Sequence, residues 1–458
     1  MTDGLKSLQL PNGLALHVLE RHAHPLVTSM VWYRVGSRDE GLGETGLSHF
    51  LEHMMFKGSA RFAKGEIDRL TASGGGSNNA FTSHDYTAYF FDFAADRWEQ
   101  ALEIEADRMR ACLLDPAEFE AEKQVVLEEL AMGKDDPWND VQDEVASHAF
   151  SLHPYRHPII GWADDLRALD VAGMRSWYER HYRPDHAIAV VVGDVEAERV
   201  FEAVRRTLGE VSSPLPHVER RTVPVEPPQR GARRIEIERD SNVARLACAW
   251  RAAPWRAPER LALEALEVIL GWGRSSRLYE ALVQGEELAA TVDVEADLRR
   301  DDGLFWAWIE VRDDADPQHA EEALLEQVEG FLERPVSPSE LARAKSILKS
   351  ELRDEQESVS GLAMRIGRLA ALDALDELEG EEARIDALTI EDVHAVARTV
   401  LQPSRRTLVL APVGRDPEDH LDARAPSSAP LALPALAWEE DGSGGPPPSE
   451  HVVQEVRS

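Results

Sequence analysis

The chain is poor in cysteine and contains no long apolar run. Cys112 and Cys248 are the two cysteines among 458 residues, which excludes a dense disulfide framework and favours a reducing compartment. The N-terminus lacks the basic start and apolar stretch of a secretory signal, and no apolar run approaches the roughly 18 residues of a membrane span. We therefore expect a cytoplasmic protein that does not enter a membrane.

Positive charge is also scarce. Lys and Arg number 50 against 84 Asp and Glu, so the formal net charge is −34. A surface of this sign repels nucleic acid and anionic lipid and attracts basic ligands, so nucleic acid is not an expected partner. Plain solubility accounts for the same excess, so the charge alone identifies no ligand.

Length and composition indicate more than one domain. At 458 residues the chain exceeds one ordinary core, and its 43% hydrophobic and 29% charged residues are typical of globular proteins. Five prolines fall in residues 211–230, which we interpret as a linker between an N-terminal domain at 1–210 and a C-terminal domain at 231–416. The tail at 417–458 is rich in Pro, Gly, Ser and acidic residues, and we predict that it is largely disordered.

The second half of the chain repeats the pattern of the first. The helical pattern that starts at Pro116 recurs at Pro338. An apolar strand pattern that follows Pro184 recurs after Pro403, at nearly the same offset along the chain. Because two separate patterns recur at nearly the same offset, a tandem duplication is favoured over chance similarity. We predict an α+β protein made of two homologous α/β domains.

One segment carries a metal-binding pattern. His49, Glu52 and His53 lie in a helical stretch between Gly46 and Phe56. Positions four apart share a helix face, so the two imidazoles can bind one metal, and Glu52 on the neighbouring edge can reach a water molecule there. This inverted H-x-x-E-H order is a zinc-peptidase arrangement. The alternative is an exposed polar helix face, but the apolar flanks predict a buried helix, where unpaired His and Glu would be costly.

A third ligand is expected on the helix that starts at Pro116. Two histidines and one carboxylate leave a fourth zinc position open for water. Glu122 and Glu129 are two helical turns apart and share a helix face, with Glu128 beside them. We predict that Glu129 binds the metal and that Glu122 orients a histidine. Glu128 and Glu122 are the alternative ligands.

With these motifs the chain resembles the pitrilysin/insulinase-type zinc peptidases, specifically the short subfamily similar to mitochondrial processing peptidase. The resemblance covers roughly residues 5–415. In that family the third ligand follows the second histidine at a characteristic spacing, which falls on Glu129 here. The family's supporting glutamate, two helical turns earlier, falls on Glu122. The resemblance implies that this chain forms half of a clam-shell chamber.

The resemblance extends to a glycine-rich turn and the strand after it. Residues Gly74–Tyr89 match the family's turn, its Asn-Ala-aromatic-Thr segment and its Asp-x-Thr-x-Tyr segment. The family implies an edge strand that binds the substrate backbone by strand addition. The substrate-binding residues that it implies are Asn79, Ala80, Phe81 and Thr82. Without the metal motif, this segment would be interpreted as an ordinary strand. Residues 153–155 (His-Pro-Tyr) also match the family, in a structural role.

The second domain departs from the metal pattern. No histidine occurs in the sequence between Pro258 and Val283, where the duplicated motif helix should lie, so only the first domain is expected to be catalytic. Active single-chain relatives carry an Arg and a Tyr at positions that hold Val283 and Ala290 here. We therefore expect a homologous subunit to supply the Arg and Tyr in a heterodimer, with a homodimer as the alternative. Arg277 is interpreted as a structural residue.

Together these features predict a zinc-dependent endopeptidase that cleaves unfolded peptides or short unstructured proteins. Glu52 would act as the base and later as the proton donor. One alternative is a non-catalytic scaffold subunit of the same family, which the intact metal residues argue against. Another is a metal-binding regulatory module without turnover. Loss of peptide cleavage in Glu52→Gln, with zinc retained, separates the peptidase from both.

Overall fold

The computed structural model describes residues 4–213, 222–238 and 241–414, and a compact unit extends to Gly414. The tail predicted at 417–458 lies outside the described residues, as does part of the predicted linker. The domain boundaries therefore stay predictions. None of the helices in the described ranges is both long and apolar enough to cross a membrane.

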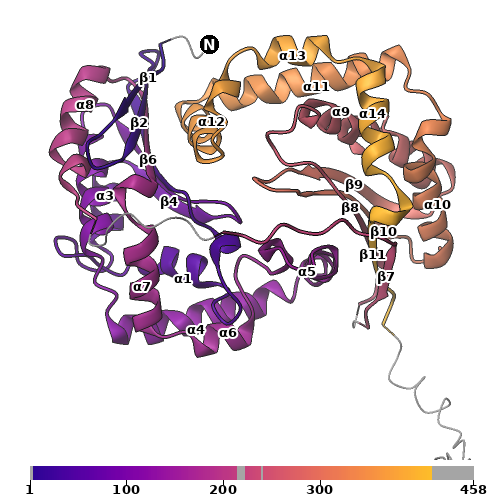
Figure 1. Ribbon diagram of the computed structural model, residues 1–458, viewed down its shortest axis with the longest axis horizontal. Coiled ribbons are helices and arrows are strands. Elements are labelled where there is room, and N and C mark those ends of the chain that lie inside the picture. Colours follow the sequence, from indigo (N-terminus) through magenta and orange to yellow (C-terminus); the bar gives the residue numbers. More distant parts are fainter. Residues whose placement is uncertain (1–3, 214–221, 239–240, 415–458) are drawn as a thin grey trace, which may run out of the picture. The chain divides into compact units, whose positions relative to one another are not determined.

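The first sheet has six strands in the order β1-β2-β6-β3-β5-β4. Figure 1 labels β1, β2, β6 and β4 of this sheet. Their bounds are β1 (Lys6–Gln9), β2 (Ala15–Glu20), β3 (Leu26–Tyr33), β4 (Ser77–Thr82), β5 (Thr87–Ala94) and β6 (Ala187–Gly193). Strand β2 runs parallel to β6, and β3 runs antiparallel to β5 and β6. Within this sheet β4 pairs with β5 alone, so β4 is an edge strand, as the family resemblance implied.

The second sheet has five strands in the order β7-β11-β8-β10-β9. Their bounds are β7 (Arg233–Glu236), β8 (Arg245–Arg251), β9 (Ala289–Asp297), β10 (Leu304–Val311) and β11 (Arg406–Ala411). Strand β7 is parallel to β11, and β8 is antiparallel to β10 and β11. The order and the relative directions of these five strands match those of the first sheet without β1. This shared topology agrees with the predicted α+β fold and tandem duplication.

The helices follow the same repeat. In the N-terminal half they are α1 (Leu47–Met54), α2 (Glu66–Ser73), α3 (Glu99–Ala111), α4 (Pro116–Gly133), α5 (Pro137–Ala149), α6 (Ala163–Ala168), α7 (Val171–His181) and α8 (Ala197–Arg206). In the C-terminal half they are α9 (Arg260–Gly271), α10 (Pro317–Glu329), α11 (Pro338–Glu357), α12 (Val359–Ala371), α13 (Glu381–Ala387) and α14 (Ile390–Val400). As predicted, α4 and α11 start at Pro116 and Pro338. Their capping residues Asp115 and Ser337 accept hydrogen bonds from first-turn N–H groups.

Each sheet is covered on one face by a helix from the other half of the chain. Helix α12 packs on β3 and β6, where its Gly367 lies against the buried Trp32. A β-carbon at Gly367 would lie 2.0 Å from Trp32 Nε1, so only glycine permits this approach. Helix α5 packs on β8 and β11, which are the equivalent strands of the second sheet. Because α5 follows α4 and α12 follows α11 at the same place in the repeat, two equivalent helices are exchanged between the halves.

Candidate metal centre

A buried carboxylate holds the start of α1. Glu40 is 2% exposed, and it accepts hydrogen bonds from the backbone N–H groups of Gly46 (2.9 Å) and Ser48 (2.7 Å). An acidic group here satisfies N–H groups that lack partners within the helix. Burial raises the pKa of Glu40 to about 8, although these hydrogen bonds oppose the shift. Sequence reasoning missed Glu40 because it caps the helix across a loop, outside the local capping patterns.

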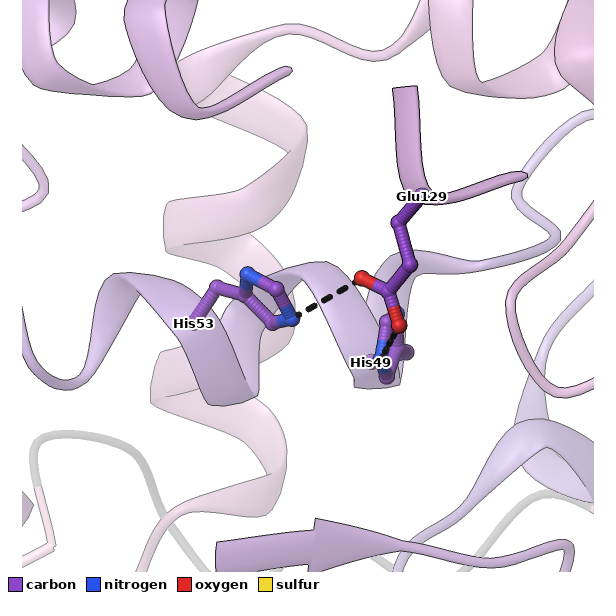
Figure 2. Close-up of side chains that lie close together, drawn as sticks. All are labelled: His49, His53 and Glu129. Carbon is purple, nitrogen blue, oxygen red and sulfur yellow. Dashed lines mark ion pairs between the residues drawn. The ribbon is translucent and has the colours of Figure 1, made fainter. Parts of the chain in front are cut away.

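Three predicted ligands converge at the middle of α1 (Figure 2). Nε2 of His49 lies 3.6 Å from Oε1 of Glu129, and Nε2 of His53 lies 3.4 Å from Oε2 of the same carboxylate. Their candidate ligand atoms all lie within 4.8 Å of one another, which makes them a group able to hold a metal ion. Two imidazoles and one carboxylate form a donor set that suits zinc and leaves one coordination position open. Glu128, the neighbouring alternative, is exposed and does not belong to this group.

Burial keeps His49 neutral. Its side chain is 14% exposed, and burial, followed by the charge of His53, lowers the pKa of His49 to about 4. A neutral imidazole offers the lone pair that a metal ion needs. In contrast, the Glu129 side chain is 47% exposed, so one side of the group is open to solvent.

Glu122 lies on the opposite side of His53. Its Oε1 is 3.0 Å from Nδ1 of His53, which leaves Nε2 of that ring facing Glu129. Its Oε2 is 2.5 Å from Nζ of Lys57. Burial by itself would raise the pKa of Glu122, but the hydrogen bonds from Lys57 and His53 outweigh it and the pKa is lowered. The structure thus places Glu122 where it can orient His53. Lys57 was not predicted, because it lies beyond the end of α1 at Met54, where helical spacing no longer applies.

Glu52 contacts the substrate strand predicted from the resemblance. Thr82, the last residue of β4, donates from Oγ1 to Glu52 Oε2 over 2.5 Å. Burial raises the pKa of Glu52, and the hydrogen bond from Thr82 opposes part of that shift. A carboxylate with a raised pKa is a better base near neutral pH. The structure therefore brings the predicted base and one end of the predicted substrate strand together.

The other three residues of this strand differ in their surroundings. Asn79 is exposed, and its Oδ1 accepts a hydrogen bond from the N–H of Ala80 over 2.9 Å. Ala80 packs against the core of the N-terminal half. The Phe81 ring packs edge-on against Trp32, with centroids 5.5 Å apart. Of these three side chains, Asn79 is the exposed one and is available for contact with a peptide.

The positions expected to hold Arg and Tyr carry apolar residues in the C-terminal half. Val283 lies in the helical turn Tyr279–Gly285 and packs against that half's core, whereas Ala290 is exposed on β9. Arg277 is buried, pairs with Glu340 over 2.7 Å and lies over the Phe331 ring. Arg277 therefore has structural partners, as predicted, and is not available to a substrate.

Two family models match most of the chain. Residues 17–162 match the model described as insulinase, peptidase family M16, and residues 168–348 match the model described as the peptidase M16 inactive domain. The chain belongs to the M16 peptidase family. This confirms the predicted family.

Curated relatives of this M16 chain are named as proteases. The chain is 28% identical over 417 residues to zinc protease PqqE of Helicobacter pylori, across 88% of this chain and 92% of that protein. It is also 28% identical over 398 residues to a probable mitochondrial-processing peptidase subunit beta of Arabidopsis thaliana, across 85% and 74%. A crystal structure of a protease from Helicobacter pylori matches with a TM-score of 0.85 at 27% identity, covering 90% of this chain and 100% of that one.

Proposed function

We propose that this M16 chain is a zinc-dependent endopeptidase that cleaves unfolded peptides or short unstructured proteins. The observation that carries the proposal is that the candidate ligand atoms of His49, His53 and Glu129 lie close together, and that the helix of the two histidines also carries the half-buried Glu52. The names of the zinc protease relatives support zinc as the metal.

The chain's own residues fit the steps of peptide hydrolysis. His49, His53 and Glu129 would hold the zinc ion, which when bound would supply Lewis acidity and lower the pKa of a water molecule to about 7. Glu52 accepts a proton from the attacking water and returns it to the leaving amine. Glu122 fixes the orientation of His53 through Nδ1, so that Nε2 stays turned toward Glu129.

The edge strand β4 is the proposed place for the substrate backbone. Its outer side has no partner strand within the described sheet, and main-chain pairing there would bind peptides with little dependence on their side chains. An extended segment is needed for such pairing, which favours unfolded substrates. Thr82 couples the end of this strand to Glu52, so a peptide paired with β4 would lie beside the base.

A non-catalytic scaffold subunit of the same family is the competing function. One of the two matching models is described as an inactive domain, and a structure described as a peptidase M16 inactive domain, from Pseudomonas fluorescens, shares the fold at 18% identity and a TM-score of 0.81, across 90% of this chain and 100% of that one. The complete set of His49, Glu52, His53 and Glu129 in this chain favours the peptidase.

The deciding experiment compares the wild-type chain with Glu52→Gln. The amide cannot accept the proton of water, so we expect cleavage of an unstructured peptide to fall by about 10² to 10⁴-fold. Zinc content and unfolding temperature should stay unchanged, since Glu52 is not in the ligand group. Activity within about tenfold of wild type would reject Glu52 as the base. A wild-type protein that binds zinc but cleaves no peptide, even with a homologous subunit present, would favour the scaffold.

We further propose that full activity requires a homologous subunit. The proposal rests on Val283 and Ala290, which provide no hydrogen-bond donor where active single-chain relatives are expected to have Arg and Tyr. Loss of one donor to the developing oxyanion reduces the rate by about 10² to 10³-fold. The partner would be of similar length, would lack the H-x-x-E-H motif and would retain the Arg and Tyr.

A further inference from the structure

Two turns and one short segment meet beside the substrate strand. The turn Ser83–Tyr86 joins β4 to β5, and the turn Leu298–Gly303 joins β9 to β10 in the C-terminal half. The segment Gly36–Glu40 leads toward the metal helix α1. None of these residues takes part in the proposed chemistry. We call their meeting point the junction.

A buried carboxylate, Asp85, receives contacts from both halves of the chain at the junction. Asp85 is 7% exposed. Its Oδ1 accepts a hydrogen bond from the Tyr155 hydroxyl over 2.5 Å, and its Oδ2 accepts one from the backbone N–H of Arg300 over 2.9 Å. Nε of Arg38 lies 3.5 Å from Oδ1. The Asp-x-Thr-x-Tyr segment and the 153–155 segment, noted separately in the sequence, are thus in direct contact.

A second carboxylate strengthens the same connection. Asp301 of the β9–β10 turn forms an ion pair with Arg38 and lies 3.0 Å from Nε2 of His153. The backbone N–H of Asp301 donates to the Tyr155 hydroxyl over 3.3 Å. Tyr155 and Arg38 therefore each contact both Asp85 and the β9–β10 turn, so displacing that turn would disturb the β4–β5 turn.

The segment Gly36–Glu40 connects the junction to the metal helix. The backbone N–H groups of Ser37 and Arg38 donate to the carbonyls of Ser83 (3.2 Å) and His84 (2.9 Å). A β-carbon at Gly36 would lie 2.4 Å from both carbonyl oxygens, so this close pairing requires glycine. At its other end the segment supplies Glu40, which caps α1. One short segment thus contacts both the substrate-strand turn and the helix of the metal ligands.

We infer that Asp85 is a positioning residue that couples the β9–β10 turn of the C-terminal half to the substrate strand. It follows closely after Thr82, whose hydroxyl bonds to Glu52, so it fixes β4 relative to the base. The inference rests on the proposed peptidase function for its effect on catalysis. It gives the C-terminal half, which contains no histidine cluster in its described residues, a role in the site of the N-terminal half.

The test compares Asp85→Asn with Asp373→Asn. Asp373 also joins the halves, through an ion pair with Arg34, and it pairs within its own half with the side chain of Arg300. Neither partner lies in the β4–β5 turn. Its φ of 57° is tolerated by asparagine, so the control breaks an ion pair without backbone strain. Hydrogen exchange at residues 77–87, kcat and KM for an unstructured peptide, zinc content and unfolding temperature would be measured for both variants.

In Asp85→Asn, we expect the backbone amide hydrogens of residues 77–87 to exchange with solvent about 10 to 100 times faster than in wild type. We also expect kcat/KM to fall by about 10 to 100-fold, with zinc retained. Asp373→Asn should change the exchange rate and kcat/KM by no more than about threefold each. Equal behaviour of the two variants would overturn the inference. If wild type cleaves no peptide even with a homologous subunit present, the proposed function fails, but the comparison of hydrogen-exchange rates still tests the coupling. Should Asp85→Asn fail to fold, Tyr155→Phe removes one donor, keeps the carboxylate and allows the same measurements.

Discussion

Glu129 and Glu128 are neighbours in sequence but have different surroundings. Glu129 lies within 3.6 Å of both histidines, whereas Glu128 is exposed outside the ligand group. Glu129→Gln removes an anionic ligand, and we expect zinc affinity to fall by at least about 100-fold, because loss of an outer partner alone costs about 10 to 100-fold. Glu128→Gln is the matched control and should leave the affinity unchanged. Competition titration with a zinc chelator gives both values. Unchanged affinity in Glu129→Gln would transfer the ligand role to Glu122 or Glu128.

Among single residues, the sequence predicted those whose role follows from helical spacing. His49 and His53 are one turn apart, and Glu122 and Glu129 are two turns apart, so each pair had to share a face. The prediction that the two helices contribute to one metal site rested on the need for a third ligand, and the spacing in the resembling family supported it. Glu40 and Asp85 were missed because they act through loops, and a carboxylate that accepts backbone N–H groups across a loop leaves no periodic signal.

At the scale of elements, α9 and β9 are joined by a half-buried carboxyl group. Glu267 accepts a hydrogen bond from the N–H of Ala296 over 3.1 Å. Burial raises its pKa from 4.5 to about 8, and the nearby Glu264 and Glu295 add to the shift. Between about pH 5 and 8 the folded chain therefore holds a proton that the unfolded chain releases. The contribution of Glu267 to the free energy of unfolding therefore falls as pH rises through this window.

We expect Glu267→Gln to reduce this pH dependence. The amide oxygen can still accept from Ala296, and no charge develops beside the neighbouring glutamates. The difference between the melting temperatures at pH 5 and pH 8 should be smaller in the variant than in wild type. The main cause should be a higher melting temperature of the variant at pH 8. Glu259→Gln, which alters an exposed carboxylate at the start of the same helix, should leave the wild-type difference intact. An unaltered difference in Glu267→Gln would contradict the prediction.

The extent of each element was easier to predict than its packing partner. Proline and capping residues set the starts of α4 and α11 because they act within one turn. The exchange of α5 and α12 had no such local signal. Apolar periodicity shows that a helix face is buried, but it does not show which sheet covers it. Gly367, in contact with Trp32, marks the pairing, and that contact joins residues from opposite halves of the chain.

At the scale of the whole molecule, the partner proposal predicts a low rate for the isolated chain. Purified protein alone, with its mass measured in solution, should cleave an unstructured peptide about 10² to 10³-fold more slowly than it does with a homologous subunit that carries the Arg and Tyr. Zinc content should be the same in both preparations. Full turnover by a monomer or homodimer, unimproved by any partner, would refute the proposal.

The exchanged helices also bear on the ancestry of the chain. Before the duplication, a single-copy ancestor had one sheet and one helix equivalent to both α5 and α12. If that helix already covered a sheet other than its own, the ancestor was a domain-swapped homodimer, and gene fusion joined its two identical subunits into one polypeptide. Fusion would have removed the concentration dependence of assembly and allowed the second copy to lose a metal-binding motif. The C-terminal half, whose described residues include no candidate metal-ligand group, would then be the remnant of an ancestral subunit, kept because its helix completes the other sheet.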